Sequence, residues 1–255
     1  MSGLIPLKDL QTEALGPLIC YPRFEGTEYL RRLKELELLN VEALELSGPL
    51  KVLNLQVLGK GCVSIVVAAA LKGGGRCALK IRRVDADRGD TLHEVEMLRR
   101  ANAAGIGPTI YGYTQNFITM ELIEGEPMPQ WVTGLRGRGS KERLRRVLER
   151  ILRQARLLDS IGLDHGELSR APKHIIVDRV DRPHIIDFET ASVKRRSSNV
   201  TALTQYLLIG SRVAREVSKR LRITGEERVI EALRRYKREP NDGNFEELLT
   251  VIGLI

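Results

Sequence analysis

The sequence predicts an α+β protein built from two lobes, and three observations lead to this class. The first is the order of elements: a helical pattern, then a half rich in strands with one helix, then a half rich in helices with one hairpin. Runs of strands followed by runs of helices are typical of α+β folds. The second is the length of 255 residues, which suits one large domain or two small ones. The third is a content of 42% hydrophobic and 29% charged residues, as in ordinary globular domains.

The first 50 residues are expected to form a helical extension. Apolar residues recur at helical spacing over 27–39, and Gly26-Thr27 and Ser47-Gly48-Pro49 mark the ends of that pattern. We therefore divide the chain into an extension at 1–50, a strand-rich lobe at 51–125 and a helix-rich lobe at 126–255.

The strand-rich lobe contains short segments with apolar and polar alternation or with β-branched runs. The expected elements are strands at 52–58, 63–71, 76–82, 109–113 and 116–122 and one helix at 91–103. The run Gly73-Gly74-Gly75 between two of these strands predicts a hairpin.

The helix-rich lobe begins with the strongest helical pattern of the chain, at 141–161, with Ser140 as the expected N-cap and Gly162 just past the end. A short hairpin is expected at 174–177 and 184–188. Helices are expected at 200–221, 225–238 and 243–252.

The net charge is +8, and most of the 41 basic residues are arginine. Arginine contacts phosphate and carboxylate groups well, so an RNA or ribonucleoprotein partner is one interpretation. The other is that the arginine face of the helix at 141–161 is simply solvated and paired, for example through Glu149 and Arg153.

Three scattered cysteines, Cys20, Cys62 and Cys77, show no metal-binding spacing and favour free thiols in an intracellular, cytoplasmic protein. The sequence has no run of 18 apolar residues and no signal-peptide pattern at its start, so no membrane association is expected.

A glycine-containing segment, Leu58-Gly59-Lys60-Gly61, joins the first two strands of the strand-rich lobe. Glycine lets backbone N–H groups approach a phosphate closely. Because a strand follows the glycines, the segment is neither a Walker A loop nor a dinucleotide-binding turn. It is a candidate phosphate lid, and a plain hairpin turn is the alternative.

Lys80 lies inside an apolar strand, where an ammonium group is costly unless it is paired. Glu94 on the following helix is the expected partner. Glu96 is a rival, but it lies about 200° around the helix from Glu94, so both cannot face the same strand. The alternative is that Lys80 lies on an edge strand and points to water.

Two motifs in the helix-rich lobe carry candidate chemistry. Asp187 ends an apolar strand, where its hard oxygens suit Mg²⁺. Glu167, in the loop after the long helix, can orient a hydroxyl nucleophile and accept its proton. The segment from Phe117 to Gly125 is either a strand end with a solvated turn or a hinge whose backbone meets adenine.

Taken in order, these motifs resemble those of the protein kinase-like superfamily. Gly59-x-Gly61 is similar to its glycine-rich loop, Ala78-Leu79-Lys80 to its strand lysine motif, and Glu94 to the ion-pair partner of that lysine. His165-Gly166-Glu167 resembles the His-Arg-Asp loop, and Asp187-Phe188-Glu189 resembles Asp-Phe-Gly. The version here is most similar to the atypical branch, which includes the RIO kinases, and especially to a group of predicted archaeal serine/threonine kinases.

This resemblance implies a bilobal fold, with a small antiparallel sheet in the N-terminal lobe and a compact helical C-terminal lobe. It also implies ATP and one or two Mg²⁺ or Mn²⁺ ions, with Glu167, Lys80 and Asp187 as catalytic residues. The nucleotide-binding candidates are Gly59, Lys60, Gly61, Ser64, Val66, Ala78, Lys80, Glu94, Met120, Glu121, Ile123 and Lys173.

Two of the departures from the family pattern bear directly on the proposed chemistry. Glu167 stands where the family usually has Asp, which keeps the carboxylate and adds one methylene. The position of the usual metal-binding Asn, counted back from Asp187, is occupied by His174. His174 is expected either to bind the metal or phosphate, which would favour Mn²⁺ or Zn²⁺, or to be a hydrogen-bonded loop residue. Lys173 either neutralises phosphate charge or is simply exposed.

These observations predict an ATP-dependent phosphotransferase, most directly an atypical serine/threonine kinase that transfers the γ-phosphate to a hydroxyl group. A protein acceptor is favoured over a small molecule. The alternatives are a catalytically weak pseudokinase or nucleotide-binding scaffold, which is either free or associated with RNA or a ribonucleoprotein, and a small-molecule kinase.

Overall fold

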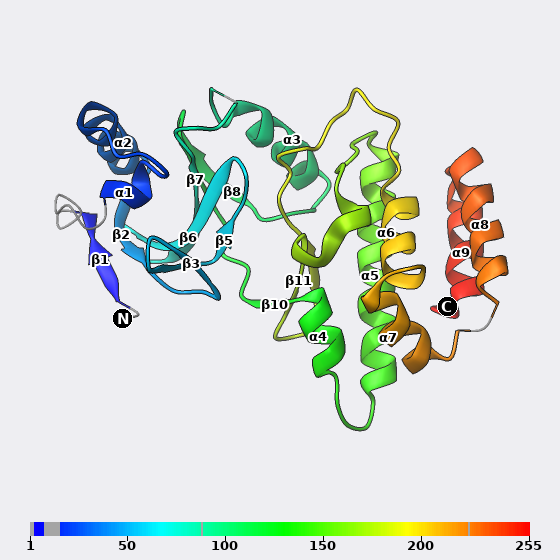
Figure 1. Cartoon of the computed structure of the whole chain (residues 1–255). Helices are drawn as coiled ribbons and strands as arrows, with labels where there is room; N and C mark the ends of the chain where they lie inside the picture. Colours follow the sequence, from blue (N-terminus) through cyan, green and yellow to red (C-terminus); the bar gives the residue numbers. More distant parts are fainter. Residues whose placement is uncertain (1–2, 8–15, 88, 224) are drawn as a thin grey trace. The chain divides into compact units, whose positions relative to one another are not determined.

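The computed structural model describes residues 3–7, 16–87, 89–223 and 225–255, and divides into two compact units (Figure 1). The first unit comprises residues 1–96 and 108–122, and the second comprises residues 97–107 and 123–255. The first is dominated by an antiparallel sheet and the second by helices, so the α+β class is confirmed. Among the described residues, no helix is both long enough and apolar enough to cross a membrane.

The sheet of the first unit has seven strands among the described residues, in the order β1-β2-β6-β7-β9-β8, with β5 paired to β6. Its strands are β1 (Leu4–Pro6), β2 (Val41–Glu45), β5 (Gly59–Lys60), β6 (Ser64–Leu71), β7 (Arg76–Arg82), β8 (Ile110–Tyr113) and β9 (Phe117–Met120). The expected hairpin is confirmed, since β6 and β7 pair antiparallel around the glycine turn. The central position of β7 excludes an edge-strand environment for Lys80.

The first 50 residues supply strands as well as the expected helix. The helix α2 (Gly26–Leu38) matches the predicted range, and α1 (Gly16–Ile19) precedes it. Strand β2 pairs with β6, and β1 pairs with β2, so both extend the sheet. The periodicity of this segment did not predict either strand.

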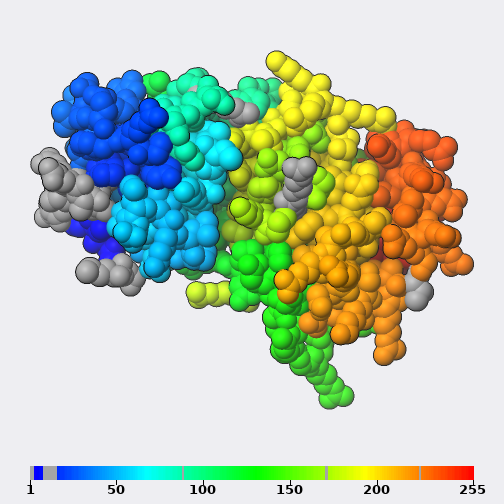
Figure 2. Space-filling view, in the orientation of Figure 1, coloured from blue at the N-terminus to red at the C-terminus, as the bar shows by residue number. Residues whose placement is uncertain are grey.

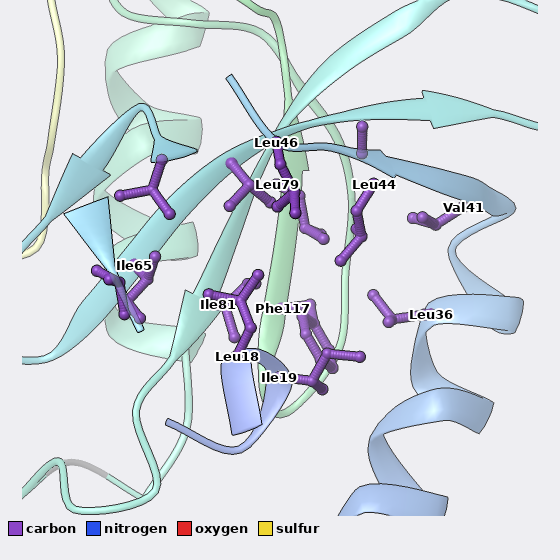
Figure 3. Close-up of a cluster of buried hydrophobic side chains, with 14 of the residues drawn as sticks. Leu18, Ile19, Leu36, Val41, Leu44, Leu46, Ile65, Leu79, Ile81 and Phe117 are labelled. Atoms are coloured by element: carbon purple, nitrogen blue, oxygen red, sulfur yellow. The ribbon is translucent and has the colours of Figure 1, made fainter. Parts of the chain in front are cut away.

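The two faces of the sheet have different roles. Alternate residues of β6 and β7, such as Ile65, Val67, Leu79 and Ile81, point into a cluster of fully buried side chains (Figure 3). Leu18 and Ile19 of α1 and Leu36 of α2 complete that cluster from the N-terminal segment. In Figure 2 the blue residues of this segment lie directly against the cyan residues of the sheet. This face is therefore closed by apolar packing, and Lys80 belongs to the opposite face.

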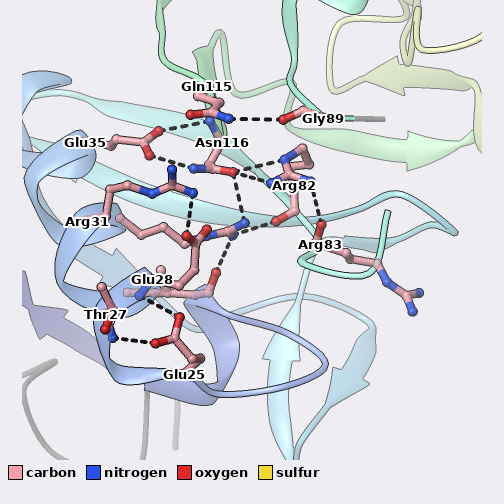
Figure 4. Close-up of polar contacts among 12 residues, drawn as sticks. Glu25, Thr27, Glu28, Arg31, Glu35, Arg82, Arg83, Gly89, Gln115 and Asn116 are labelled. Atoms are coloured by element: carbon pink, nitrogen blue, oxygen red, sulfur yellow. Dashed lines mark hydrogen bonds and ion pairs between the residues drawn. The ribbon is translucent and has the colours of Figure 1, made fainter. Parts of the chain in front are cut away.

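A buried polar network fastens α2 to the same sheet (Figure 4). The Arg32 guanidinium, which has no exposed surface, donates to the carbonyls of Ile19 (2.7 Å) and Arg82 (2.6 Å) and to Asn116 Oδ1 (3.0 Å). The Glu35 carboxylate accepts from the backbone N–H (2.9 Å) and side-chain amide (2.6 Å) of Asn116. Each buried charge thus has several partners, as burial of a charge requires.

The expected strand at 52–58 is wrong. The structure has instead a tight hairpin of β3 (Leu50–Val52) and β4 (Leu55–Val57). Leu53 and Asn54 form its turn with φ values of 51° and 65°. Two positive φ values at the centre of a two-residue turn are what the right-handed twist of the strands demands. A leucine is uncommon there, so the sequence carried little indication of the turn.

The second unit contains α4 (Met128–Gly134), α5 (Ser140–Ser160), α6 (Asn199–Leu208), α7 (Arg212–Leu221), α8 (Glu226–Arg238) and α9 (Asp242–Ile252). Its small antiparallel sheet has the order β10 (Gly125–Pro127), β11 (Ile175–Asp178) and β12 (Pro183–Ile185). Helix α3 (Leu92–Ala103) lies between β7 and β8 in the chain. The apolar face predicted for α5 is buried along its whole length.

Two predicted helix boundaries are wrong in this unit. Ser140 is the first residue of α5 rather than its N-cap; the cap is Gly139, at a φ of 85° and without a side-chain hydrogen bond. The helix expected at 200–221 is broken into α6 and α7. Gly210 has a φ of 72° at the break, and Ser211 Oγ caps α7 by accepting from the N–H of Ala214 (2.8 Å).

Candidate active site

The first group of candidate residues lies on the sheet face opposite the apolar cluster. The Lys80 Nζ contacts Glu94 Oε1 at 2.7 Å, and both side chains are more than nine-tenths buried. The structure therefore pairs Lys80 with Glu94, as the sequence predicted. A buried ion pair of this kind is costly to desolvate, and breaking it leaves an uncompensated charge.

Strand register places further nucleotide-binding candidates beside Lys80. Val66 of β6 and Ile118 of β9 are its direct neighbours across the sheet. Ala78, two residues before Lys80 and thus on the same face, is opposite Met120. Small and apolar side chains therefore surround one paired ammonium group on this face.

The glycine-rich segment is formed by β5 and the turn into β6. Gly59 pairs with Val66, and the N–H of Gly61 donates to the carbonyl of Ser64 (2.8 Å). A Cβ atom added at Gly59 or Gly61 would meet its nearest neighbour at an ordinary distance of 3.5 or 3.6 Å, and neither residue is in the left-handed region. The fold itself therefore does not require glycine at either position. Lys60 is exposed, and Ser64 is buried.

The segment after β9 is held by its own contacts. The backbone N–H of Glu121 donates to the carbonyl of Thr109 (2.8 Å), and its carboxylate accepts from the N–H and hydroxyl of Thr109 (both 3.2 Å). Part of the polar capacity of Glu121 is therefore used within the fold. Ile123 follows in the second unit.

The second group of candidate residues converges in the second unit. Glu167 lies in the loop after α5, His174 follows the 3₁₀ helix η2 (Leu168–Lys173), and Asp187 follows β12. His174 Nε2 lies 3.2 Å from Glu167 Oε2 and 3.7 Å from Asp187 Oδ2. One ligand atom from each residue lies within 4.8 Å of the other two. Within the described residues, this is the cluster of acidic and histidine side chains that could bind a metal ion.

The antiparallel pairing of β11 and β12 explains why these residues meet. The carbonyl of His174 accepts from the N–H of Ile186 (3.0 Å), which places Asp187 beside the histidine. Asp187 has a φ of 69°, which is unusual for a residue other than glycine. Such backbone strain is concentrated at functional sites. Lys173, at the end of η2, is exposed.

His165 contacts both chain neighbours of Asp187. Its fully buried ring packs on Phe188 at a centroid distance of 5.0 Å, and its Nε2 lies 3.1 Å from the carbonyl of Ile186. Burial lowers the pKa of His165 to about 4, so the ring is neutral at pH 7 and its Nε2–H donates to that carbonyl.

Gly166 is the glycine that this loop requires. It has a φ of 88°, and a Cβ atom there would lie 3.0 Å from both the carbonyl and hydroxyl oxygens of Thr190 and 2.6 Å from the Arg195 guanidinium. Arg195 in turn donates to Asp164 Oδ2 (3.0 Å) and to the Thr190 carbonyl (2.7 Å). The segment after Asp187 is thus packed directly on the loop that carries Glu167.

Sequence reasoning missed a second layer of support, formed by Asp159 and Asn199. Asn199 donates through its amide to the carbonyl of Leu163 (2.7 Å) and to Asp159 Oδ1 (2.9 Å). Asp159 also accepts from the N–H groups of Asn199 (2.8 Å) and Val200 (3.2 Å) and from the Tyr236 hydroxyl (2.8 Å). In the sequence, a Ser-Ser-Asn run before a helix was the only indication of this supporting role.

The arginine face of α5 is largely accounted for by ion pairs within the second unit. Arg143 pairs with Asp181, Arg145 with Glu142, Arg153 with Glu149 and Glu246, and Arg156 with Asp242. The expected Glu149–Arg153 pair is confirmed, at 2.9 Å. The fold therefore gives these four arginines a role that needs no nucleic acid.

The first unit has an antiparallel sheet with a buried lysine–glutamate pair. The second, helical unit has one carboxylate in the loop after α5 and another just after strand β12. This combination is that of a kinase-like protein. A sequence model described as the RIO domain matches residues 72–205. The chain therefore belongs to the RIO domain family of atypical, kinase-like proteins, and the resemblance seen in its motifs is confirmed.

The chain also has an archaeal relative. The chain is 31% identical over 121 residues to the uncharacterized protein MJ1211 of Methanocaldococcus jannaschii. The similarity covers 47% of this chain and 99% of that protein. Kinase-like RIO domains in general use ATP and a divalent metal ion.

Proposed function

We propose that the protein is an ATP-dependent phosphotransferase, and specifically an atypical serine/threonine kinase that phosphorylates a hydroxyl group on a protein. The convergence of Glu167, His174 and Asp187 carries this proposal. Family membership supports the general class, and the residues below support the finer assignment.

Asp187 and His174 would hold a divalent metal ion. A carboxylate oxygen and an imidazole nitrogen fit Mn²⁺ well, and a carboxylate-rich site also fits Mg²⁺. When bound, such an ion neutralises charge on the transferring phosphate. Glu167 would orient the acceptor hydroxyl and accept its proton, which is the role of a general base.

The residues of the sheet would bind the nucleotide. Lys80, positioned by Glu94, would contact the phosphates, and the segment with Gly59, Lys60 and Gly61 would cover them. The fold does not require glycine at either position. Close approach of a phosphate to the backbone would explain why glycine is present there, and this supports the role. Ser64, Val66, Ala78, Met120, Glu121 and Ile123 would complete the nucleotide site, with Lys173 as a further phosphate contact.

One observation favours a second candidate, a nucleotide-binding protein with little turnover. Glu167 Oε2 lies 3.2 Å from His174 Nε2, so the proposed base contacts a proposed metal ligand. In that case the protein would bind ATP with a metal ion and transfer phosphate very slowly.

Transfer from labelled ATP tests both candidates. Wild-type protein would be incubated with Mg²⁺ or Mn²⁺ and with protein or small-molecule acceptors, and compared with Asp187→Asn and Glu167→Gln. We expect transfer to protein by the wild type, no measurable transfer by Asp187→Asn, and a loss of about 10²–10⁴-fold in Glu167→Gln with ATP binding retained. Glu142→Gln, which removes an exposed carboxylate on α5, is the matched control.

Undiminished turnover in Asp187→Asn would exclude the proposed mechanism. ATP binding without transfer in the wild type under every metal would select the second candidate instead.

A further inference from the structure

The outer surface of the glycine-rich segment contacts one aromatic ring from the N-terminal segment. The Lys60 Nζ lies 5.1 Å from the centre of the Tyr21 ring, and the Arg83 Cζ lies 5.1 Å from the same centre. Both distances are within the range in which a cation is attracted to an aromatic face. Tyr21 therefore contacts the segment directly through Lys60 and indirectly through Arg83.

Arg83 connects this ring to the backbone of the glycine-rich segment. Its guanidinium donates to the carbonyl of Gly61 (3.2 Å), and its backbone N–H donates to the carbonyl of Val63 (2.8 Å). Asp85 orients the guanidinium by accepting from Nε (2.9 Å) and Nη2 (2.7 Å). In Figure 4 the Arg83 side chain points away from the buried network around Asn116 and Arg82.

The position of Tyr21 is set by the core of the first unit. It directly follows Leu18, Ile19 and Cys20, which have no exposed surface, and its own side chain packs against the same cluster. Its carbonyl also accepts from the N–H of Val84 (2.9 Å). The ring is thus presented from a rigid base, whereas the segment it contacts is a short exposed turn.

We propose that Tyr21 is a positioning residue for the glycine-rich segment, which it orders through Lys60 and Arg83 before the nucleotide binds. The role of that segment as a phosphate lid rests on the proposed function. The ordering itself does not, because every contact that carries it exists without nucleotide. The N-terminal segment would thereby tune nucleotide affinity from outside the range matched by the family model.

Backbone hydrogen exchange of residues 58–63, measured by mass spectrometry, tests the ordering without an activity assay. Tyr21→Leu keeps an apolar side chain on the core and removes the aromatic face, whereas Tyr21→Phe keeps that face. Phe24→Leu is the matched control, because Phe24 is a more exposed aromatic residue of the same segment that packs on Tyr29. Alkylation of Cys62, an exposed thiol within the turn, is a second readout, since Cys20 and Cys77 are buried.

We expect exchange over 58–63 to be at least about threefold faster in Tyr21→Leu, because loss of one cation contact alone produces about that change and this variant loses two. Tyr21→Phe and Phe24→Leu should match the wild type. Lys60→Met, at an exposed side chain, should also accelerate exchange there and leaves the core intact. Cys62 alkylation should follow the same order.

Exchange over 58–63 that is unchanged in both Tyr21→Leu and Lys60→Met would overturn the inference. Faster exchange in Tyr21→Leu that extends equally to the amides of the first unit's core strands would also overturn it, because Tyr21 would then act only in packing. A separate arm adds ATP with Mn²⁺ to the wild type: failure to slow exchange over 58–63 would count against the proposed function and leave the role of Tyr21 intact.

Discussion

The side-chain oxygen of Asn199, the first residue of α6, accepts a hydrogen bond from the backbone N–H of His165 at 2.9 Å. The amide nitrogen of the same side chain donates to the carbonyl of Leu163 on the other side of Asp164. One buried amide thus holds two peptide groups of the loop that leads to Glu167. Through Asp159 the same support extends to Tyr236 on α8, so three helices brace the candidate active site.

Replacing Tyr236 by Phe should lower the free energy of unfolding by about 1.5–3 kcal/mol, because its hydroxyl donates to the Asp159 carboxylate. Tyr206 provides a matched control, since its buried hydroxyl has no hydrogen-bond partner among the described residues. Tyr206→Phe should therefore be close to neutral. Chemical denaturation of both variants measures the difference, and equal losses would contradict the assignment.

Lys80 and Glu94 allow stability to be separated from catalysis. Lys80→Met alone should destabilise the protein by about 3–5 kcal/mol, because it removes the ammonium group that contacts the buried Glu94 carboxylate at 2.7 Å. The double variant Lys80→Met/Glu94→Leu should recover most of that stability. Phosphate transfer should be absent from both variants. Recovery of transfer together with stability would mean that the pair serves only the fold.

Alanine substitutions in the glycine-rich segment should leave the stability of the fold nearly unchanged and should weaken ATP binding. Gly59→Ala and Gly61→Ala should shift the unfolding free energy by less than about 1 kcal/mol, since a Cβ atom fits at both positions. ATP affinity should fall in both. Gly166→Ala is the contrasting variant, because it should destabilise the loop itself. Unchanged ATP affinity in the first two variants would leave the segment as a plain turn.

Stability should depend on pH through His165. Its pKa is about 4 in the folded protein and 6.5 as an ordinary histidine, so between these values the unfolded chain binds a proton that the folded chain does not. The free energy of unfolding therefore falls as the pH decreases from 6.5 to 4, by about 3 kcal/mol in total at about 1.4 kcal/mol per pKa unit.

The variant His165→Phe isolates this contribution. It should be less stable than the wild type at pH 7, where it lacks the hydrogen bond to Ile186, and should lose about 2 kcal/mol less between pH 7 and pH 5. Denaturation curves at the two pH values measure the slopes. Parallel slopes would show that His165 is not the group responsible.

His174 should determine the metal preference. In His174→Asn an amide oxygen replaces an imidazole nitrogen beside Asp187, so the ratio of Mn²⁺-supported to Mg²⁺-supported transfer should fall. Titration of free Mn²⁺ by electron paramagnetic resonance should show weaker binding in the variant. Unchanged Mn²⁺ binding would remove His174 from the metal site and leave it as a loop residue.

Local patterns were sufficient to predict much of this fold and the pairing of Lys80 with Glu94. The strands around Lys80 are apolar runs separated by a glycine turn, and the helix that became α5 is strongly periodic. The motifs also occur in the order of a known superfamily. The β3–β4 hairpin escaped prediction because Leu53 adopts a conformation that its side chain disfavours. Strand β2 was not predicted because its place in the sheet depends on pairing with residues of β6 that lie more than 20 residues away.

The residues that support the candidate site were not predicted from the sequence, for a related reason. Asp159 lies near the end of α5 and Asn199 at the start of α6, and only the tertiary fold brings them together. Their residue types are common at helix ends, where they usually cap their own helix. Candidate catalytic residues can therefore be predicted from a single sequence more readily than the residues that position them.

Because the buried guanidinium of Arg32 and its neighbours in the N-terminal segment hold the first unit together, they limit where the protein can be truncated. A truncated protein that begins at residue 72, the start of the RIO match, would lack β1, β2, β5 and β6 as well as Leu18, Ile19 and Leu36. The apolar face of the remaining strands β7, β8 and β9 would then be exposed. It would also remove Arg32 and Glu35, which are two of the partners of the Asn116 amide. We expect such a fragment to aggregate on expression, and one that begins just before α1 to be the shortest soluble form.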